Sequence, residues 1–153
     1  MNNSSTTVTD GFSSLRLPSC KKEFIRQLND VNMGDMCFED RLCLIVDAEI
    51  TSRKSNRAEH KVREAQFKIK ARPELISYDF ARLPNKNRIL SLLAANFIAL
   101  GQNVLISGPT GVGKSYLATA IGVAACEKEY KVIYFKLSNL QEKLTISRLD
   151  VTY

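Results

Sequence analysis

The chain has no long apolar run, and no stretch of its 153 residues approaches the roughly 20 needed to cross a bilayer. Its first residues, MNNSSTTVTDGFSS, contain neither a basic lead nor an apolar core, which argues against a secretory signal. Hydrophobic residues make up 44% and charged residues 25%, a balance typical of soluble globular proteins. We therefore expect a protein of the cytoplasm that does not enter a membrane.

Cysteine is scarce and has no ligand pattern. Cys20, Cys37, Cys43 and Cys126 show neither a CxxC motif nor a Cys/His spacing suited to zinc. Reduced thiols are therefore favoured over disulfides or a metal centre. Zinc fingers, aromatic RNA-binding motifs and a clear helix-turn-helix are also missing from the sequence.

The N-terminal part offers few side chains that could bury surface. Residues 1–19 are rich in Ser, Thr and Asn, and only a weak helical pattern follows at 21–33. We expect residues 1–35 to be disordered or poorly ordered. From Phe38 the apolar residues recur every three or four positions, which predicts an amphipathic helix that continues into a basic stretch and stops near Arg72-Pro73.

The excess positive charge is concentrated in that basic stretch. The chain carries a formal net charge of +6, and residues 53–72 alone hold eight Lys and Arg against two Glu, which is also +6. Arg53, Arg57 and Lys61 recur every four residues, with Lys54 beside them and Arg63 beyond. Such a ridge can follow a phosphate backbone, so residues 36–75 are predicted to form a basic helical DNA-binding region. The alternative is an ordinary solvated helix face.

A glycine-rich motif carries the chemistry. Residues 108–115 read Gly-Pro-Thr-Gly-Val-Gly-Lys-Ser and match GxxxxGK[ST] at every fixed position. Glycines let successive backbone N–H groups wrap a polyphosphate, and the following helix directs its positive end at it. Lys114 is predicted to bridge the β- and γ-phosphates, and the Ser115 hydroxyl to take one Mg²⁺ position. The predicted nucleotide contacts are Gly108, Pro109, Thr110, Gly111, Val112, Gly113, Lys114, Ser115 and Tyr116.

The segments around this motif predict an α/β fold. Residues 103–107 and 132–135 are short apolar runs typical of strands, and a helical pattern fills 113–128 between them. A further helix is predicted near 87–100, with Gly101 as its terminator. No acidic residue after Ser115 ends an apolar strand, and no arginine finger can be assigned. Nucleotide binding is therefore predicted, while no catalytic residue is assigned.

From about Phe38 onward the chain resembles the IstB family, the ATP-binding helper proteins of insertion-sequence transposases. These are relatives of DnaC-type helicase loaders within the AAA+ class. The resemblance rests on FEDRLCLIVDAEITSRKSNR, YDFARLP, the segment 103–140 around the P-loop, and LDVTY. It implies a P-loop NTPase core of AAA+ type with a parallel sheet over residues 76–153, ATP and Mg²⁺ as cofactors, DNA and a transposase as partners, and a homo-oligomer on DNA.

The resemblance also implies that part of the AAA+ core is missing from this chain. In the AAA+ sheet order, the strand before the P-loop does not neighbour the second strand, because others lie between them. Segment 103–107 would then lose its partners and expose apolar side chains. We expect a truncated copy. The function implied is an ATP-dependent transposition helper; the alternatives are a replicative helicase loader and a non-catalytic DNA-binding fragment.

Overall fold

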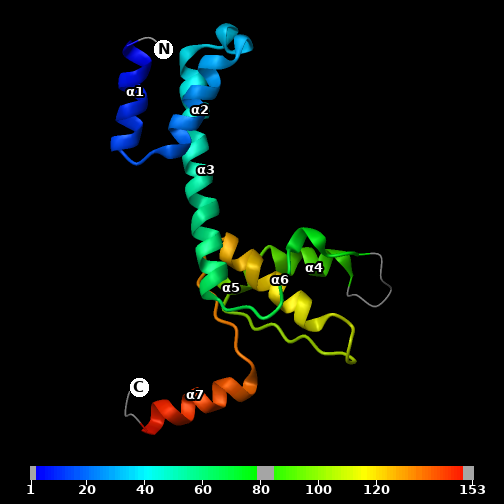
Figure 1. The fold of residues 1–153 in the computed structure, drawn as a ribbon. Coiled ribbons are helices and arrows are strands. Elements are labelled where there is room, and N and C mark those ends of the chain that lie inside the picture. The colour runs from blue at the N-terminus through cyan, green and yellow to red at the C-terminus, as the bar shows by residue number, and fades with distance from the viewer. Residues whose placement is uncertain (1–2, 79–84, 150–153) are drawn as a thin grey trace. The chain divides into compact units, whose positions relative to one another are not determined.

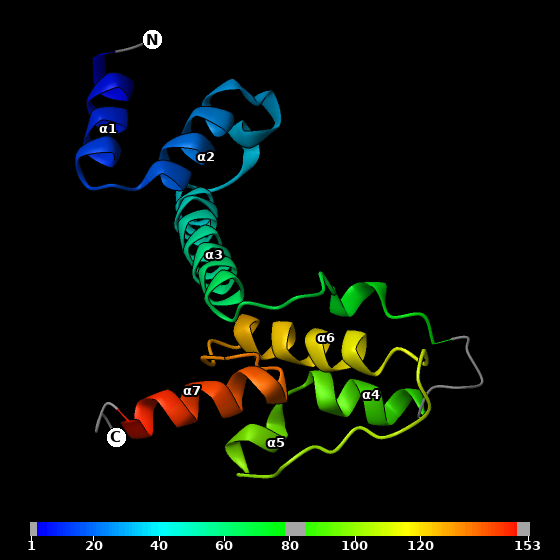
Figure 2. The same ribbon diagram turned by 60° about the horizontal axis from the view of Figure 1, so that its bottom comes forward.

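The computed structural model describes residues 3–78 and 85–149, and all regular structure in that part of the chain is helical (Figures 1 and 2). Its contacts divide the chain into two compact units, residues 1–57 and 58–153, which are described in turn. Residues 79–84 and 150–153 hold most of the YDFARLP and LDVTY segments, and these lie outside the described residues.

The first unit begins with two helices where little order was expected. They are α1 (Asn3–Ser14) and α2 (Pro18–Asn29), followed by the short 3-10 helix η1 (Val31–Asp35). The rings of Phe12 and Phe24 join α1 to α2 edge to face, with centroids 5.9 Å apart. Within α1 the Thr9 hydroxyl donates to the Thr6 carbonyl at 2.8 Å, so this buried polar side chain has a hydrogen-bond partner in its own helix. The expectation for residues 1–35 is corrected accordingly.

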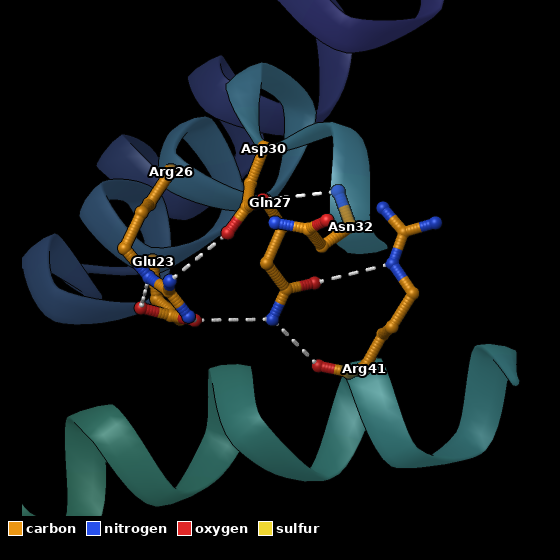
Figure 3. A network of polar contacts seen from close by, with 6 residues as sticks. All are labelled: Glu23, Arg26, Gln27, Asp30, Asn32 and Arg41. Carbon is orange, nitrogen blue, oxygen red and sulfur yellow. Dashed lines mark hydrogen bonds and ion pairs between the residues drawn. The ribbon is translucent and has the colours of Figure 1, made fainter. Parts of the chain in front are cut away.

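A polar network joins α2 to the start of α3 (Phe38–Glu64) (Figure 3). Its centre is Gln27, which is 2% exposed. The Gln27 amide donates to Glu23 Oε1 at 3.2 Å and to the Arg41 carbonyl at 3.1 Å. Arg26 pairs with Glu23 at 2.7 Å and with Asp30 at 3.6 Å. Because every polar atom of Gln27 has a partner, its burial is compatible with a stable contact.

Helix α3 confirms the predicted periodicity but is shorter than predicted. It runs through the basic stretch as far as Glu64 and ends well before Arg72. The chain leaves the helix at Gln66, whose φ of 55° lies in the left-handed region, a common conformation just after a helix. The preceding residue, Ala65, is fully buried, so packing rather than the distant proline sets the end of the helix.

The second unit is built around the helix that follows the glycine-rich motif. Its elements are η2 (Pro73–Leu75), α4 (Lys86–Leu93), α5 (Asn96–Ala99), α6 (Lys114–Glu127) and α7 (Leu137–Leu149). Helix α6 packs on α4 and η2, and their core contains Ala71, Ile76, Ile89, Leu117, Ala120 and Ile121. The helix predicted near 87–100 is broken at Ala95 (φ 55°), while Gly101 (φ 63°) follows its last turn as predicted.

The two predicted strands are not formed, and none occurs elsewhere in 3–78 or 85–149. Segment 103–107 leaves Leu105 93% exposed, and segment 132–135 leaves Ile133 59% exposed. The second segment is held by a hydrogen bond from the Tyr134 N–H to the Ala65 carbonyl, at 3.0 Å. A strand is stable only when neighbouring strands take its backbone groups and cover its apolar faces. The predicted α/β fold therefore agrees with the structure in its helices, whereas its parallel sheet is not formed in the described residues.

Two further expectations concern membranes and thiols. Across the described ranges, no helix is both long and apolar enough to cross a bilayer. All four cysteines are free; Cys20 and Cys126 are buried, and Cys37 and Cys43 are exposed. Burial raises the pKa of the Cys20 and Cys126 thiols, which keeps them protonated.

Candidate functional site

The loop before α6 has the backbone that the motif predicts. Gly108, Gly111 and Gly113 adopt φ values of 151°, 87° and 87°. Residues with a side chain are strained in this region, so glycine is required by the backbone angles. Space is not the constraint: a Cβ at Gly108 would lie 3.6 Å from Val112 Cγ2, and those at Gly111 and Gly113 would meet nothing within 4 Å. The loop is therefore a glycine-dependent turn with exposed backbone.

The start of α6 provides donors for an anion. Its N-cap, Gly113, has no side chain to accept from the first turn, and the Leu117 N–H to Gly113 carbonyl bond (2.9 Å) is the first of the helix. The N–H groups that precede Leu117 in the helix have no intrahelical acceptor, and they lie at the positive end of the helix dipole. An uncapped helix N-terminus of this kind suits a phosphate group.

Lys114 is the first residue of α6 and reaches back across the loop. Its Nζ donates to the Pro109 carbonyl oxygen at 2.5 Å, while the side chain is half-buried. The ammonium group is thus held over the turn formed by Pro109 to Gly113. Ser115 follows in the first turn and is exposed, as are Thr110 and the loop glycines. The predicted contact residues therefore gather around one exposed turn.

Tyr116, the last of the predicted nucleotide contacts, points its side chain toward the core. Its ring packs against the core between α6 and its neighbours. Its hydroxyl lies 3.5 Å from both the backbone nitrogen and the carbonyl oxygen of Arg72. The side chain therefore supports the loop from the core, and only the backbone N–H of Tyr116 belongs to the exposed helix start.

The predicted basic ridge is partly engaged within the protein. Arg53 pairs with Glu49 at 2.9 Å and donates from Nη2 to the Arg16 carbonyl at 3.1 Å. The Lys61 ammonium donates to the Glu129 carbonyl just beyond α6, where a cation stabilises the helix C-terminus. Lys54, Arg57 and Arg63 have exposed side chains. Arg53 and Lys61 therefore each make a structural contact within the protein.

A carboxylate that the sequence did not reveal organises the first unit. The Oε2 atom of Glu49 accepts from the N–H groups of Ser19 at 2.9 Å and Cys20 at 3.3 Å. Leu17, the N-cap of α2, makes no side-chain cap, so a residue of α3 caps α2 instead. The hydrogen bond from Arg53 lowers the pKa of the Glu49 carboxyl. The sequence does show an acidic residue, Glu49, on the apolar side of α3. Only the tertiary contact shows that it caps α2.

The residues around the loop fit a nucleoside triphosphate. The glycine turn and the uncapped start of α6 fit its phosphates, and the Lys114 ammonium supplies a positive charge beside them. The Ser115 hydroxyl is suited to one Mg²⁺ position, because hydroxyl oxygen is a hard ligand. Among the residues that the structure describes, no group of three or more His, Cys, Asp or Glu is placed to hold a metal ion. The residues around the loop fit the binding of a nucleoside triphosphate. No carboxylate is assigned to its hydrolysis.

This fold and loop fit a protein of the nucleotide-binding class, and comparison with known sequences gives the family. The model for the IstB-like ATP binding protein family matches residues 11–153. The chain belongs to this family. It is 27% identical to "Insertion sequence IS232 putative ATP-binding protein" of Bacillus thuringiensis subsp. berliner, over 98% of the chain. It is 32% identical to "Insertion sequence IS1162 putative ATP-binding protein" of Pseudomonas fluorescens, over 77% of the chain.

The matched relatives are longer than this chain. The alignments cover 60% of the Bacillus thuringiensis protein and 52% of the Pseudomonas fluorescens protein. A protein of Sinorhizobium fredii that also bears an insertion-sequence ATP-binding name is 29% identical, with 47% of its length covered. The chain therefore spans about half the length of the curated relatives it matches.

Proposed function

We propose that this protein binds ATP with Mg²⁺ at residues 108–116 and serves as a cytoplasmic helper in transposition. The observation that carries the proposal is the loop itself: three glycines at positive φ lead into a helix whose first turn has no side-chain cap. Membership of a family of ATP-binding proteins, with relatives named for insertion sequences, supports the same function.

The residues of the loop would act by holding and orienting the nucleotide. Backbone N–H groups of the turn and of the first turn of α6 would donate to phosphate oxygens. Lys114 would leave the Pro109 carbonyl and pair with the β- and γ-phosphates, and Ser115 would contribute to Mg²⁺ coordination. Bound Mg²⁺ neutralises phosphate charge. No described residue is assigned to the attack on the γ-phosphate, so the proposal is nucleotide binding without an assigned catalytic residue.

We further propose that segments 103–107 and 132–135 are strands of an AAA+ sheet that become paired when its other strands are supplied. Their exposed apolar residues, such as Leu105 and Ile133, are what unpaired strands would show. Core packing on one side supports this, since Ile106 contacts the cluster around α6. The proposed binding partners of the protein are a transposase and further copies of the chain on DNA.

DNA contact is proposed for the five basic residues of the ridge, Arg53, Lys54, Arg57, Lys61 and Arg63. All of them except Lys61 have exposed side chains. The test is fluorescence anisotropy of a short labelled duplex over a salt series. If Lys54 touches one phosphate, Lys54→Ala reduces the slope of log K against log salt by about 1. The matched control is Lys136→Ala, an exposed lysine before α7. Equal slopes for the two variants and the unmodified protein would contradict this contact.

Nucleotide dependence separates the helper from a passive fragment. We expect ATP with Mg²⁺ to change the DNA affinity of the unmodified protein and to leave Lys114→Ala unchanged. DNA binding that ignores nucleotide in both proteins would favour a non-catalytic DNA-binding fragment. A replicative helicase loader remains the other function of this fold; the insertion-sequence names of the relatives favour the helper.

A further inference from the structure

The chain that follows α3 lies along one side of α6. We call residues 66–72 the strap. The Phe67 ring lies over Gly122 in the middle of α6, where a Cβ would be 2.7 Å from Phe67 Cζ. Further along the strap, the backbone nitrogen and carbonyl oxygen of Arg72 each lie 3.5 Å from the hydroxyl of Tyr116, in the first turn of α6. Because later residues of the strap contact earlier residues of α6, the strap runs antiparallel to the helix (Figure 2).

The strap begins where α3 meets the C-terminal end of α6. The Lys61 ammonium, in the last turn of α3, donates to the Glu129 carbonyl just beyond α6. Ala65, between Lys61 and the strap, is fully buried, and its carbonyl accepts from the Tyr134 N–H at 3.0 Å. The strap therefore joins the last turn of α3 to the end of α6 that follows the glycine-rich loop.

The strap is held by side chains more than by its backbone. Within the described residues, none of the backbone N–H groups from Phe67 to Ala71 donates to another backbone group. Ala71 is buried in the core beside α6, whereas Lys68, Lys70 and Arg72 are exposed. Segments with few backbone hydrogen bonds open at a low cost in free energy. A small change in α6 can therefore release or fix the strap.

Tyr116 contacts both the strap and the proposed phosphate site. It follows Ser115 directly, and its backbone N–H belongs to the uncapped first turn of α6, whereas its hydroxyl faces the backbone of Arg72. A separation of 3.5 Å is at the outer limit of a hydrogen bond, so a small movement of the first turn strengthens or breaks this contact. Phosphates that accept from the N–H groups of this turn would hold it in one position. Nucleotide binding can thus act on the strap through one side chain.

We propose that Tyr116 is a positioning residue that links nucleotide binding to the strap. A nucleotide at residues 108–116 fixes the first turn of α6, and the Tyr116 hydroxyl then fixes the strap; this regulation rests on the proposed nucleotide site. Because the strap continues from the last turn of α3, nucleotide binding also acts on the part of the chain that carries Lys61 and Arg63 of the basic ridge. Linkage is reciprocal, so a fixed strap favours nucleotide binding in turn.

The experiment is limited digestion of the full chain by trypsin, with and without a fluorescent ATP analogue and Mg²⁺. Trypsin cleaves after lysine and arginine, so the strap offers the bonds Lys68–Ile69 and Lys70–Ala71. Cleavage requires local opening of the chain around the bond. We expect a saturating analogue to slow cleavage at both strap bonds about fivefold or more. The Arg16–Leu17 bond in the first unit is the internal control, and its cleavage should not change.

The decisive variant is Tyr116→Phe, which removes only the hydroxyl and keeps the ring in the core. With the analogue at a saturating concentration for this variant, the protection of the two strap bonds should be lost. Tyr130→Phe, just beyond α6, makes the same chemical change elsewhere and should keep the protection. A merely structural role of Tyr116 would alter cleavage equally with and without nucleotide. Analogue fluorescence measures binding in each digest, and far-UV circular dichroism compares the helix content of the proteins.

The outcomes separate this inference from the proposed function. Analogue binding that does not slow cleavage of the strap in the unmodified chain would overturn the inference and leave the nucleotide site intact. Protection that persists in Tyr116→Phe would also overturn it. So would a Tyr116→Phe chain that no longer binds the analogue, because the hydroxyl is assigned to the strap and not to the nucleotide. A lack of binding by the unmodified chain would instead overturn the proposed function and the inference with it.

Discussion

Gly122 lies within α6 at a place where a methyl group has no room. A Cβ built there would lie 2.7 Å from Phe67 Cζ, 2.8 Å from Phe67 Cε1 and 3.5 Å from Val132 Cγ1. Ordinary carbon–carbon contacts are about 3.5–4.0 Å, so the ring of Phe67 would have to withdraw by about 1 Å. That ring is itself packed edge to face on Tyr134, with centroids 6.2 Å apart. Gly122→Ala therefore disturbs the contact between α6 and segment 132–135.

Two opposing terms set the size of the effect. Replacing Gly by Ala inside a helix contributes about 0.5–1 kcal/mol of stability. Overpacking of a filled site costs about 1–3 kcal/mol. We expect the second term to win, so that Gly122→Ala lowers the free energy of unfolding by about 1 kcal/mol. In a Phe67→Leu background the clashing ring atoms are gone, and the same substitution should raise stability by about 0.5 kcal/mol.

The assay is a double-mutant cycle measured by urea unfolding, with far-UV circular dichroism as the signal. Four proteins are compared: the unmodified chain, Gly122→Ala, Phe67→Leu and the double variant. We predict a coupling free energy of about 1–2 kcal/mol between the two positions. If Gly122→Ala stabilises both backgrounds equally, Phe67 does not pack against α6 at Gly122.

Two further predictions concern single residues. Glu49→Gln should raise the hydrogen-exchange rates of the Ser19 and Cys20 amides, because their charged acceptor is lost. The pKa of Glu49 is lower in the folded protein than in the unfolded chain. The ionised carboxylate therefore stabilises the fold fully above the ordinary carboxyl pKa of about 4.3, and this stabilisation is lost as pH falls through the pKa of the folded protein. The Glu49→Gln variant should lack this acid-dependent loss of stability. Gly113→Ala should lower stability by about 1–2 kcal/mol because φ is 87°, whereas Gly34→Ala, with open space and no positive φ, should not. Thermal unfolding compares the last two variants.

The local sequence pattern was enough to predict α3 and α6. The apolar spacing from Phe38 predicted α3, and the glycines around the motif predicted both the loop and the start of α6. Gly101 was correctly predicted to follow the end of a helix. These features depend on periodicity or on backbone angles, which are determined by residues close together in the sequence.

Features that depend on distant partners were missed. The cap on α2 comes from Glu49, about thirty positions away, and no local signal joins the two. The spacing that predicts Arg53 as a DNA contact gives no sign of its ion pair with Glu49 or of its hydrogen bond to the Arg16 carbonyl. Segments 103–107 and 132–135 have the composition of strands, but composition does not supply the neighbours that a sheet needs.

We propose that the glycine turn and Lys114 form a nucleotide site in this chain. The most direct measurement is titration of the purified chain with a fluorescent ATP analogue and Mg²⁺, beside Lys114→Ala and the control Lys136→Ala. We predict saturable binding by the unmodified chain and the control, and binding at least tenfold weaker for Lys114→Ala, because the charged group held over the loop is lost. No binding by any of the three proteins, or equal binding by all three, would contradict the account.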